Sequence, residues 1–224
     1  MGERRDPIAE VMRQGFHTMV RRGLRGVWLR GDLPGGPFVW AANHHSWWDP
    51  FVADVVLRDA GRRGCLIMLE ENRRRFGFVR RLGVFGTNEP RRGLDFLTAG
   101  RVLVIYPEGE LRPAGPLGPL ADGAGWYARR ANVPLCAVAT RVLLRGQEAP
   151  EAYLSTSVVD VVGPNRDVTR RLGEELDRLL SEVDKLGGVE DPRAPLPGYR
   201  LILSGRRSHD ERIEAMSGRL PWRS

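Results

Sequence analysis

Short apolar runs alternate along the chain with longer stretches in which apolar residues recur every three or four positions. The apolar runs end at turn-forming residues and predict buried strands at 38–42, 65–68, 102–106 and 133–139. The run at 102–106 is apolar throughout, as expected of a central parallel strand covered on both faces. The stretches between the runs predict helices at about 47–60 and 121–131. This alternation of strands and helices is typical of α/β folds.

The remaining pattern predicts a first strand, a sheet edge, a long helix and a tail. The first strand lies at 27–30 and the strand at the sheet edge at 153–162. The long helix runs from Asp167 to about Leu186, and the tail follows from Gly187. Because the tail is rich in proline and glycine, we expect it to be extended or partly disordered. The chain therefore divides into an N-terminal helix (1–24), one domain (25–187) and a basic C-terminal tail (188–224).

The N-terminal stretch at 6–24 predicts an amphipathic helix. Its apolar residues recur at helical spacing, and arginines occupy much of the rest: the apolar set is Ile8, Met12, Phe16, Met19 and Val20. One interpretation is a surface helix packed on the core. The other is a helix lying on an anionic membrane, where apolar burial and basic attraction add.

Length and composition describe an ordinary globular protein. A chain of 224 residues is long enough for one domain with a sizeable core. No run of 18 or more apolar residues predicts a transmembrane helix, and we expect no signal peptide. Cys65 and Cys136 fall in predicted buried strands, and two unpaired buried cysteines fit the reducing cytoplasm.

The net charge of +7 implies an anionic partner. The charge is uneven, because residues 1–30 and 62–81 each hold seven arginines against three and two acidic residues. Aromatics lie among the arginines at 73–83, but no nucleic-acid-binding motif accompanies them, so we expect no nucleic acid partner. This stretch is either a solvated loop or a wall that receives anionic headgroups or an anionic acyl donor.

Two adjacent histidines, His44 and His45, stand at the turn between a predicted strand and helix, with Asp49 close behind. Open α/β sheets commonly place active sites at such turns, and a histidine with a carboxylate partner is the minimal set for general-base chemistry. Ser46 and Asp49 also match a capping box, with Ser46 as the helix N-cap. A metal site or purely structural histidines are further alternatives, and spacing alone does not say which histidine is the base.

A second polar turn follows the strand at 102–106. It contains Glu108, Gly109 and Arg112, which are well placed at the carboxyl end of a central strand to grip a polar substrate group. The alternative is a turn whose proline and glycine only end the strand.

The chain resembles the glycerolipid acyltransferases, also called the PlsC-type lysophospholipid acyltransferase family. The resemblance rests on four blocks in the family's order: Asn43-His44 with Asp49 (NHxxxxD), Leu82–Phe85, Tyr106–Gly109 and Val133–Leu135. It is specific over residues 38–140 and looser over 25–187. It implies an α/β fold: a single domain with a mixed, mostly parallel β-sheet flanked by helices. It also implies an O-acyltransferase that needs no metal or cofactor, with acyl-CoA or acyl carrier protein as donor and a lipid hydroxyl as acceptor.

Carried over residue by residue, the resemblance implies that His44 is the general base and Asp49 its orienting partner. Glu108 and Gly109 correspond to the family's acceptor-binding turn. Three positions depart from the family pattern and weaken the case for a phosphate on the acceptor. Asn88 stands near the usual place of an arginine, Glu110 replaces a small hydroxyl residue, and Asp122 replaces a basic residue. Arg91, Arg92 and Arg112 are the candidates to bind a phosphate instead.

The sequence therefore predicts acyl transfer to a lysophospholipid, 1-acylglycerol-3-phosphate, by a cytoplasmic enzyme that lies peripherally on the inner face of the cell membrane. The alternatives are O-acylation of a neutral glycosyl or hydroxylated lipid, a thioester or lipid hydrolase, and a non-enzymatic lipid-binding module.

Overall fold

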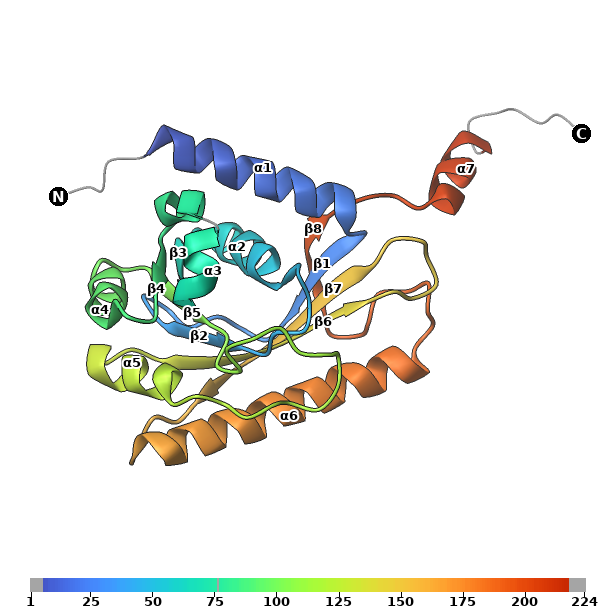
Figure 1. Cartoon of the computed structure of the whole chain (residues 1–224). Coiled ribbons are helices and arrows are strands. Elements are labelled where there is room, and N and C mark those ends of the chain that lie inside the picture. The colour runs from blue at the N-terminus through green and yellow to red at the C-terminus, as the bar shows by residue number, and fades with distance from the viewer. Residues whose placement is uncertain (1–5, 76, 218–224) are drawn as a thin grey trace, which may run out of the picture.

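The computed structural model describes residues 6–75 and 77–217. Its centre is an eight-stranded sheet with helices on both faces (Figure 1). The strands are β1 (Gly26–Arg30), β2 (Val39–Ala42), β3 (Gly64–Met68), β4 (Val84–Gly86), β5 (Val102–Ile105), β6 (Leu135–Leu143), β7 (Glu151–Val159) and β8 (Arg200–Ser204). The helices are α1 (Pro7–Gly23), α2 (Asp49–Asp59), α3 (Glu70–Arg75), the 3-10 helix η1 (Gly77–Leu82), α4 (Pro90–Thr98), α5 (Gly123–Ala131), α6 (Asn165–Val189) and α7 (His209–Ser217).

The strand order is β4-β3-β5-β2-β6-β7-β1-β8. The five strands from β4 to β6 run parallel to their neighbours, β7 is antiparallel to β6 and parallel to β1, and β8 is antiparallel to β1. The predicted single-domain α/β fold with a mixed, mostly parallel sheet is therefore confirmed. Because β2 and β5 are parallel neighbours, the turns that follow them meet at the same edge of the sheet.

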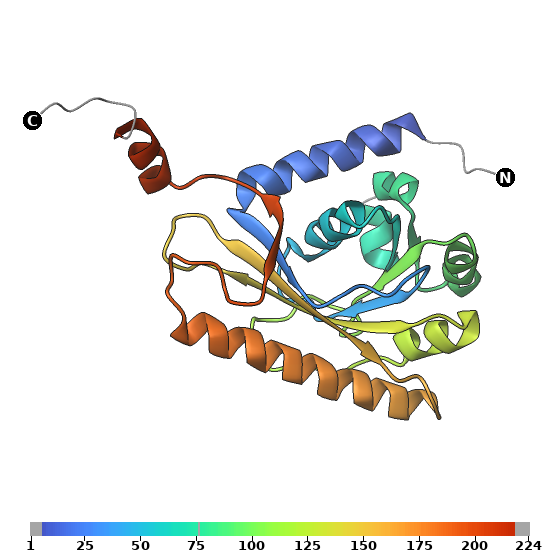
Figure 2. The ribbon, with the colours of Figure 1, turned by 180° about the vertical axis from the view of Figure 1, so that it is seen from behind.

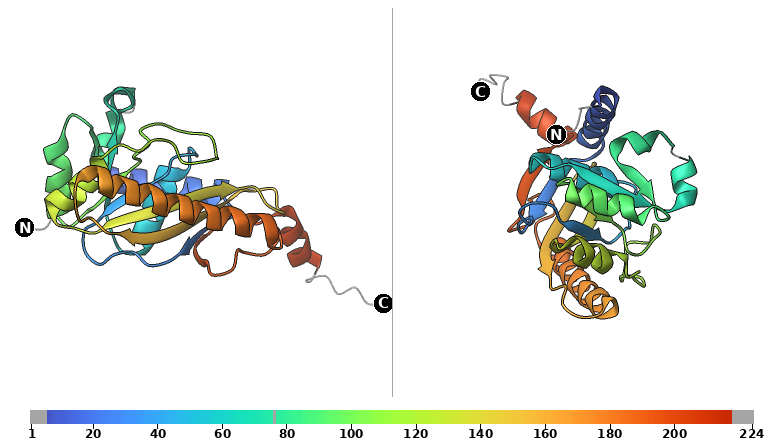
Figure 3. Two further views of the ribbon diagram at one scale, coloured as in Figure 1. Left: turned by 90° about the horizontal axis from the view of Figure 1, so that it is seen from below. Right: turned by 90° about the vertical axis from the view of Figure 1, so that its left-hand side faces the viewer.

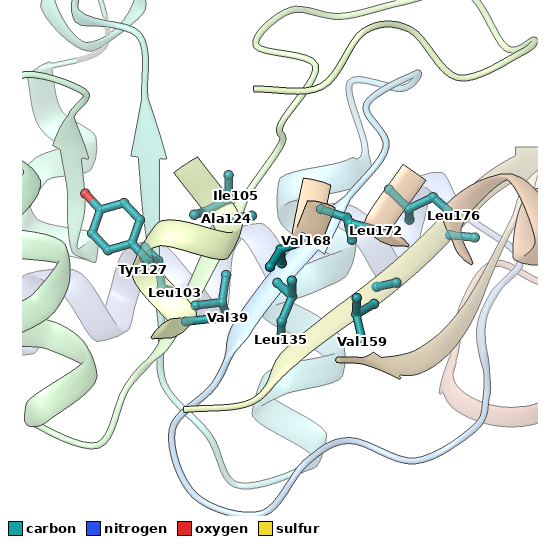
Figure 4. Packing of buried hydrophobic residues seen from close by; sticks show 14 of the residues in the cluster. Val39, Leu103, Ile105, Ala124, Tyr127, Leu135, Val159, Val168, Leu172 and Leu176 are labelled. Carbon is teal, nitrogen blue, oxygen red and sulfur yellow. The ribbon is translucent and has the colours of Figure 1, made fainter. Parts of the chain in front are cut away.

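Alternation along the strands separates two apolar cores. In β2, Val39 and Ala41 face α4, α5 and α6, whereas Trp40 and Ala42 face α1 and α2. Figure 4 shows the first core, where Val39 lies among side chains from neighbouring strands and helices, and Figure 3 shows α6 lying along this face of the sheet. Each fully buried aliphatic side chain contributes about 1.5–3 kcal/mol of transfer free energy, so both layers of helices stabilise the sheet.

Helix α1 packs on the core. Asp6 caps it, since Oδ1 accepts hydrogen bonds from the amides of Ile8 and Ala9 at 3.0 and 3.3 Å. Val20 is fully buried, and the Phe16 ring meets Phe51 of α2 edge-on at 4.9 Å. The structure thus shows α1 packed on the core, with Ile8 and Val11 left 52% and 72% exposed.

The Arg13 side chain fastens α1 to its neighbours. It donates a hydrogen bond to the Leu82 carbonyl at 2.8 Å and forms an ion pair with Asp54 of α2. Burial raises the pKa of the Asp54 carboxyl, and the positive charge of Arg13 partly offsets that effect.

The prediction of an extended or partly disordered tail is wrong for the residues up to Ser204. Leu196 and Tyr199 are buried, and β8 pairs with β1 at one edge of the sheet, as Figure 2 shows. The strand predicted at the sheet edge, β7, lies inside the sheet between β6 and β1, because β1 pairs with it. The supposed loop at 73–83 is also mostly helical, in α3 and η1.

Candidate active site

Asn43 and His45 fasten the turn after β2 to strand β6. The Asn43 side chain accepts a hydrogen bond from the Thr140 amide at 2.8 Å and donates one to the Thr140 carbonyl at 3.1 Å, which continues the β2–β6 ladder beyond Ala42. The His45 Nε2 accepts a hydrogen bond from the Val142 amide at 3.1 Å. Accepting this bond occupies the lone pair of Nε2, and burial lowers the pKa of His45.

His44 is bound to Asp49 instead. The His44 Nδ1 lies 2.8 Å from Asp49 Oδ2, and the side chain of Asp49 is only 1% exposed. A buried carboxylate beside Nδ1 fixes the tautomer in which Nδ1 carries the proton and Nε2 presents its lone pair. No hydrogen bond within the described residues occupies Nε2, and the imidazole is 22% exposed.

The same oxygen of Asp49 also organises the turn. It accepts hydrogen bonds from the amides of His45 and Ser46 at 3.0 and 2.9 Å. The prediction that Ser46 is the helix N-cap is wrong, because α2 begins at Asp49, Trp48 takes the N-cap position, and Ser46 Oγ accepts from the Trp48 amide at 3.2 Å. Asp49 thus orders the turn and holds His44 with a single carboxylate.

The turn after β5 supports His44 from the other side. The Tyr106 ring stacks on the His44 ring with centroids 4.4 Å apart, and Gly109 closes the turn with φ of 75° and a hydrogen bond to the Tyr106 carbonyl. The Glu108 carboxylate accepts from the His44 amide at 2.9 Å and from the Gly118 amide at 3.0 Å. Glu108 therefore braces the backbone at the site, in addition to any contact with a substrate.

The predicted arginines are placed differently from one another. The Arg112 amide donates to the His44 carbonyl at 2.8 Å, and its guanidinium pairs with Glu110 at 2.6 Å. Arg91 and Arg92 lie at the start of α4, where Arg92 pairs with Glu89 at 3.5 Å and neither contacts His44 or Asp49. The structure thus brings Arg112 to the site through its backbone and leaves the other two outside it.

An apolar pocket of about 530 Å³, called here the acyl pocket, begins at His44. Leu111 lines the pocket at the carboxyl edge of the sheet. Leu57, near the end of α2, and Gly64, at the start of β3, line it farther from that edge. Phe16 and Met19 of α1 form part of its wall. A pocket of this size and lining is typical of sites for small apolar ligands.

Two other kinds of site are not found in the described part of the chain. Residues 6–75 and 77–217 contain no group of three or more histidine, cysteine or acidic side chains arranged to hold a metal ion. None of the helices in those ranges combines the length and apolar character needed to span a bilayer.

Cys65 and Cys136 are buried and unpaired, and burial raises the pKa of each thiol to about 12.

The family model described as Acyltransferase matches residues 19–141, which is more than half of the chain and includes the His44 turn and the Glu108 turn. The chain belongs to the acyltransferase family. It is therefore an O-acyltransferase, and the predicted family is confirmed.

A solved relative agrees with this fold. The acyltransferase is similar to the crystal structure of the 1-acyl-sn-glycerophosphate (LPA) acyltransferase PlsC from Thermotoga maritima, with 19% identity and a TM-score of 0.60 over 79% of this chain and 78% of that one. No curated protein sequence matches the chain.

Sequence reasoning missed the parts of the site that depend on contacts between distant strands. The stacking of Tyr106 on His44 and the pairing of Asn43 with Thr140 require β5, β2 and β6 to be neighbours. The one available signal was the position of Asn43, next to the histidines and directly after an apolar run.

Proposed function

We propose that this acyltransferase moves a fatty acyl group from an acyl thioester, either acyl-CoA or acyl carrier protein, to a lipid hydroxyl. The observation that carries the proposal is the unoccupied Nε2 of His44 in the wall of the acyl pocket, with Nδ1 held by the buried Asp49. A thioester is already activated, so a positioned base is sufficient and no serine or cysteine nucleophile is required.

In the proposed mechanism, His44 Nε2 takes the proton from the acceptor hydroxyl as its oxygen attacks the thioester carbonyl carbon. The tetrahedral intermediate collapses, the carbon–sulfur bond breaks, and the leaving thiolate receives the proton from His44. Asp49 stabilises the imidazolium during the step, because its carboxylate lies 2.8 Å from Nδ1. The Tyr106 ring and the Glu108 carboxylate keep the imidazole in place.

The acyl pocket suits the hydrocarbon chain of an acyl donor. Gly64 lines the far end of the pocket. It lies four residues before Met68, the last residue of β3, so the pocket is about 13 Å deep along this strand. A β-carbon at Gly64 would lie 3.1 Å from a Leu57 methyl group and 3.8 Å from one of Val104. A side chain at this position therefore occupies the end of the pocket.

We expect Gly64→Leu to shift the enzyme toward shorter acyl chains. Each methylene that no longer fits loses about 0.8 kcal/mol of burial, so turnover of long-chain thioesters should fall tenfold or more after about two methylenes are excluded. The measurement is kcat/KM against a series of acyl-CoA chain lengths, with Gly64→Ala as the smaller matched change. Equal loss for short and long chains would indicate general damage and contradict the proposed pocket.

For the acceptor we propose a phosphorylated lysolipid, 1-acylglycerol-3-phosphate, in line with the substrate named for the Thermotoga maritima relative. Arg112 is beside the site, since its amide donates a hydrogen bond to the His44 carbonyl. A neutral glycosyl or hydroxylated lipid is the second candidate, favoured by a specific observation. Arg112 and Arg92 are already paired with Glu110 and Glu89, which lowers their capacity to bind a further anion.

The function and the acceptor are tested together by thiol release from acyl-CoA, with products identified by mass spectrometry. Lysophosphatidic acid and neutral hydroxylated lipids compete in one reaction. An acylated acceptor among the products would establish acyl transfer. Thiol release with free fatty acid as the only acyl product would indicate a hydrolase. The absence of thiol release would indicate a lipid-binding module.

If the acceptor phosphate is bound by arginine, Arg112→Ala should depress turnover of lysophosphatidic acid about tenfold and leave the neutral lipids unchanged. Arg91→Ala and Arg92→Ala are the matched controls, because these side chains lie on α4, away from His44. The phosphate assignment is wrong if all three variants keep the same selectivity or if the unmodified enzyme prefers the neutral lipid.

We also propose that the enzyme works on an anionic membrane, at the inner face of the cell membrane. Support comes from the rim of the acyl pocket, where Trp47 and Leu111 are 58% and 56% exposed. Leu69, which follows the pocket residue Met68, is 45% exposed. Exposed apolar side chains around a pocket mouth favour contact with a lipid surface. We therefore propose that the mouth of the acyl pocket contacts the lipid surface.

A further inference from the structure

A second cleft lies on the side of α1 that faces away from the acyl pocket. Its volume is about 560 Å³, and its lining comes from two segments that are far apart in the sequence. We call it the arginine cleft; its lining is Gln14, His17, Thr18, Arg21 and Arg22 of α1 together with Gly205, Arg206 and Arg212 after β8. The α1 residues of the two cavities occupy nearly opposite helix faces, so the cavities are distinct.

Backbone contacts hold the two segments together. The amides of Gly205 and Arg206 donate hydrogen bonds to the carbonyls of Arg25 and Leu24 at 2.9 and 2.8 Å, directly after α1. A β-carbon at Gly205 would lie 1.9 Å from the Leu24 carbonyl oxygen, so only glycine permits this approach. In both Figure 1 and Figure 2, the chain that leaves β8 runs beside the end of α1. The cleft is therefore built into the fold.

The described lining of the arginine cleft contains no carboxylate. Within the described residues, no hydrogen bond or ion pair involves the guanidinium groups of its four arginines. By contrast, Arg25 pairs with Glu151 and Glu211 at 2.8 Å each. The carboxylate of Glu148 is near enough to Arg206 for its pKa to be lowered in part by that charge, but it accepts its hydrogen bond from the amide of His209.

Positive charge from the cleft and from Arg58 of α2 acts on His17, which lines the cleft. Burial lowers the pKa of His17, and the positive charges of Arg58 and Arg21 lower it further, with Asp54 opposing them. Gathering like charges in one cleft is unfavourable unless an anion offsets the repulsion. Guanidinium groups that line one cleft can bind the oxygens of phosphate groups in bidentate fashion.

We propose that the arginine cleft binds a ligand carrying clustered phosphate charges, separately from the His44 site. Two sources share this chemistry: the headgroup phosphates of anionic lipids and the diphosphate of a soluble acyl donor. Both would approach the same guanidinium groups from α1 and from the segment after β8.

The direct test is calorimetric titration of the full chain with inorganic pyrophosphate. Removing one arginine from each segment, in Arg21→Ala with Arg206→Ala, is expected to weaken binding about tenfold or more. Arg130→Ala is the matched control, since it removes an exposed arginine from α5 on the other face of the sheet, and it should bind as the unmodified protein does. Binding should also weaken when ionic strength rises from about 0.1 to about 1 M. The proposal is overturned if pyrophosphate does not bind or if the double variant and the control behave alike.

The source of the phosphate is separated by two further measurements. A lipid source predicts that the double variant loses flotation with phosphatidylglycerol vesicles while phosphatidylcholine vesicles show no difference. A soluble source predicts that coenzyme A displaces pyrophosphate and that vesicle flotation is unchanged by the variant. If the variant alters neither vesicle binding nor coenzyme A binding, the proposal fails. None of these readouts requires acyl transfer, so they stand apart from the test of the proposed function.

Discussion

Replacing His44 with alanine is expected to lower kcat about a hundredfold to ten-thousandfold while the protein remains folded. The magnitude is that of a positioned general base, and no second base with a free lone pair stands at Asp49. The imidazole is 22% exposed and its removal leaves Asp49 with its two backbone amide partners, so the loss of stability should be small. The measurement is steady-state turnover of acyl-CoA with the proposed acceptor, lysophosphatidic acid, together with a melting curve.

His45→Ala is the matched control and should show the reverse pattern. The His45 ring accepts the Val142 amide, so its removal leaves a backbone donor without a partner and is expected to cost about 1–3 kcal/mol of stability. Turnover by the folded fraction should change far less than in His44→Ala. Equal losses of activity in both variants, or full activity in His44→Ala, would show that the base has been assigned to the wrong residue.

Asp49→Asn should lower kcat about a hundredfold or more with little change in melting temperature. Asparagine can keep an oxygen where Oδ2 now accepts the amides of His45 and Ser46, so the turn is retained. What disappears is the negative charge 2.8 Å from His44 Nδ1, which stabilises the imidazolium formed during proton transfer.

This variant separates an orienting carboxylate from a helix cap. Asparagine and aspartate cap helices about equally well, so a residue that only caps would tolerate the change in both activity and stability. Retained activity would therefore favour the capping interpretation. Asp49→Ala provides the complementary control, because it removes all three hydrogen bonds and should lower the melting temperature as well.

The elements that the sequence predicted are those with strong local signals. The run at 102–106 became β5, buried on both faces, and the helical spacing after Asp167 became α6. Helix α3 was missed because Glu70–Arg75 is entirely polar and carries no apolar periodicity. Strand β8 was missed because its partner, β1, lies far away in the sequence and its surroundings are rich in proline and glycine.

The active site shows the same difference between residues recognised from a local motif and residues whose position depends on the tertiary structure. His44 and Asp49 were recognisable because they belong to one contiguous motif with only four residues between them, although only the family resemblance chose His44 over its neighbour. The structure supplies a physical reason for that choice, since the Nε2 of His45 is bound to the Val142 amide. Arg91 and Arg92 were candidates because they follow the family's second block, where an arginine is usual. In the structure they lie at the start of α4, where Arg92 pairs with Glu89.

The position of α1 over the acyl pocket bears on how substrate preference is inherited within the family. The family model begins at residue 19, whereas Arg13 and Phe16, which line the pocket, lie before it. Two relatives with identical catalytic blocks are therefore expected to differ in acyl selectivity when only their leading helices differ. Exchanging those helices between enzymes offers a route to new chain-length preferences without touching the chemistry.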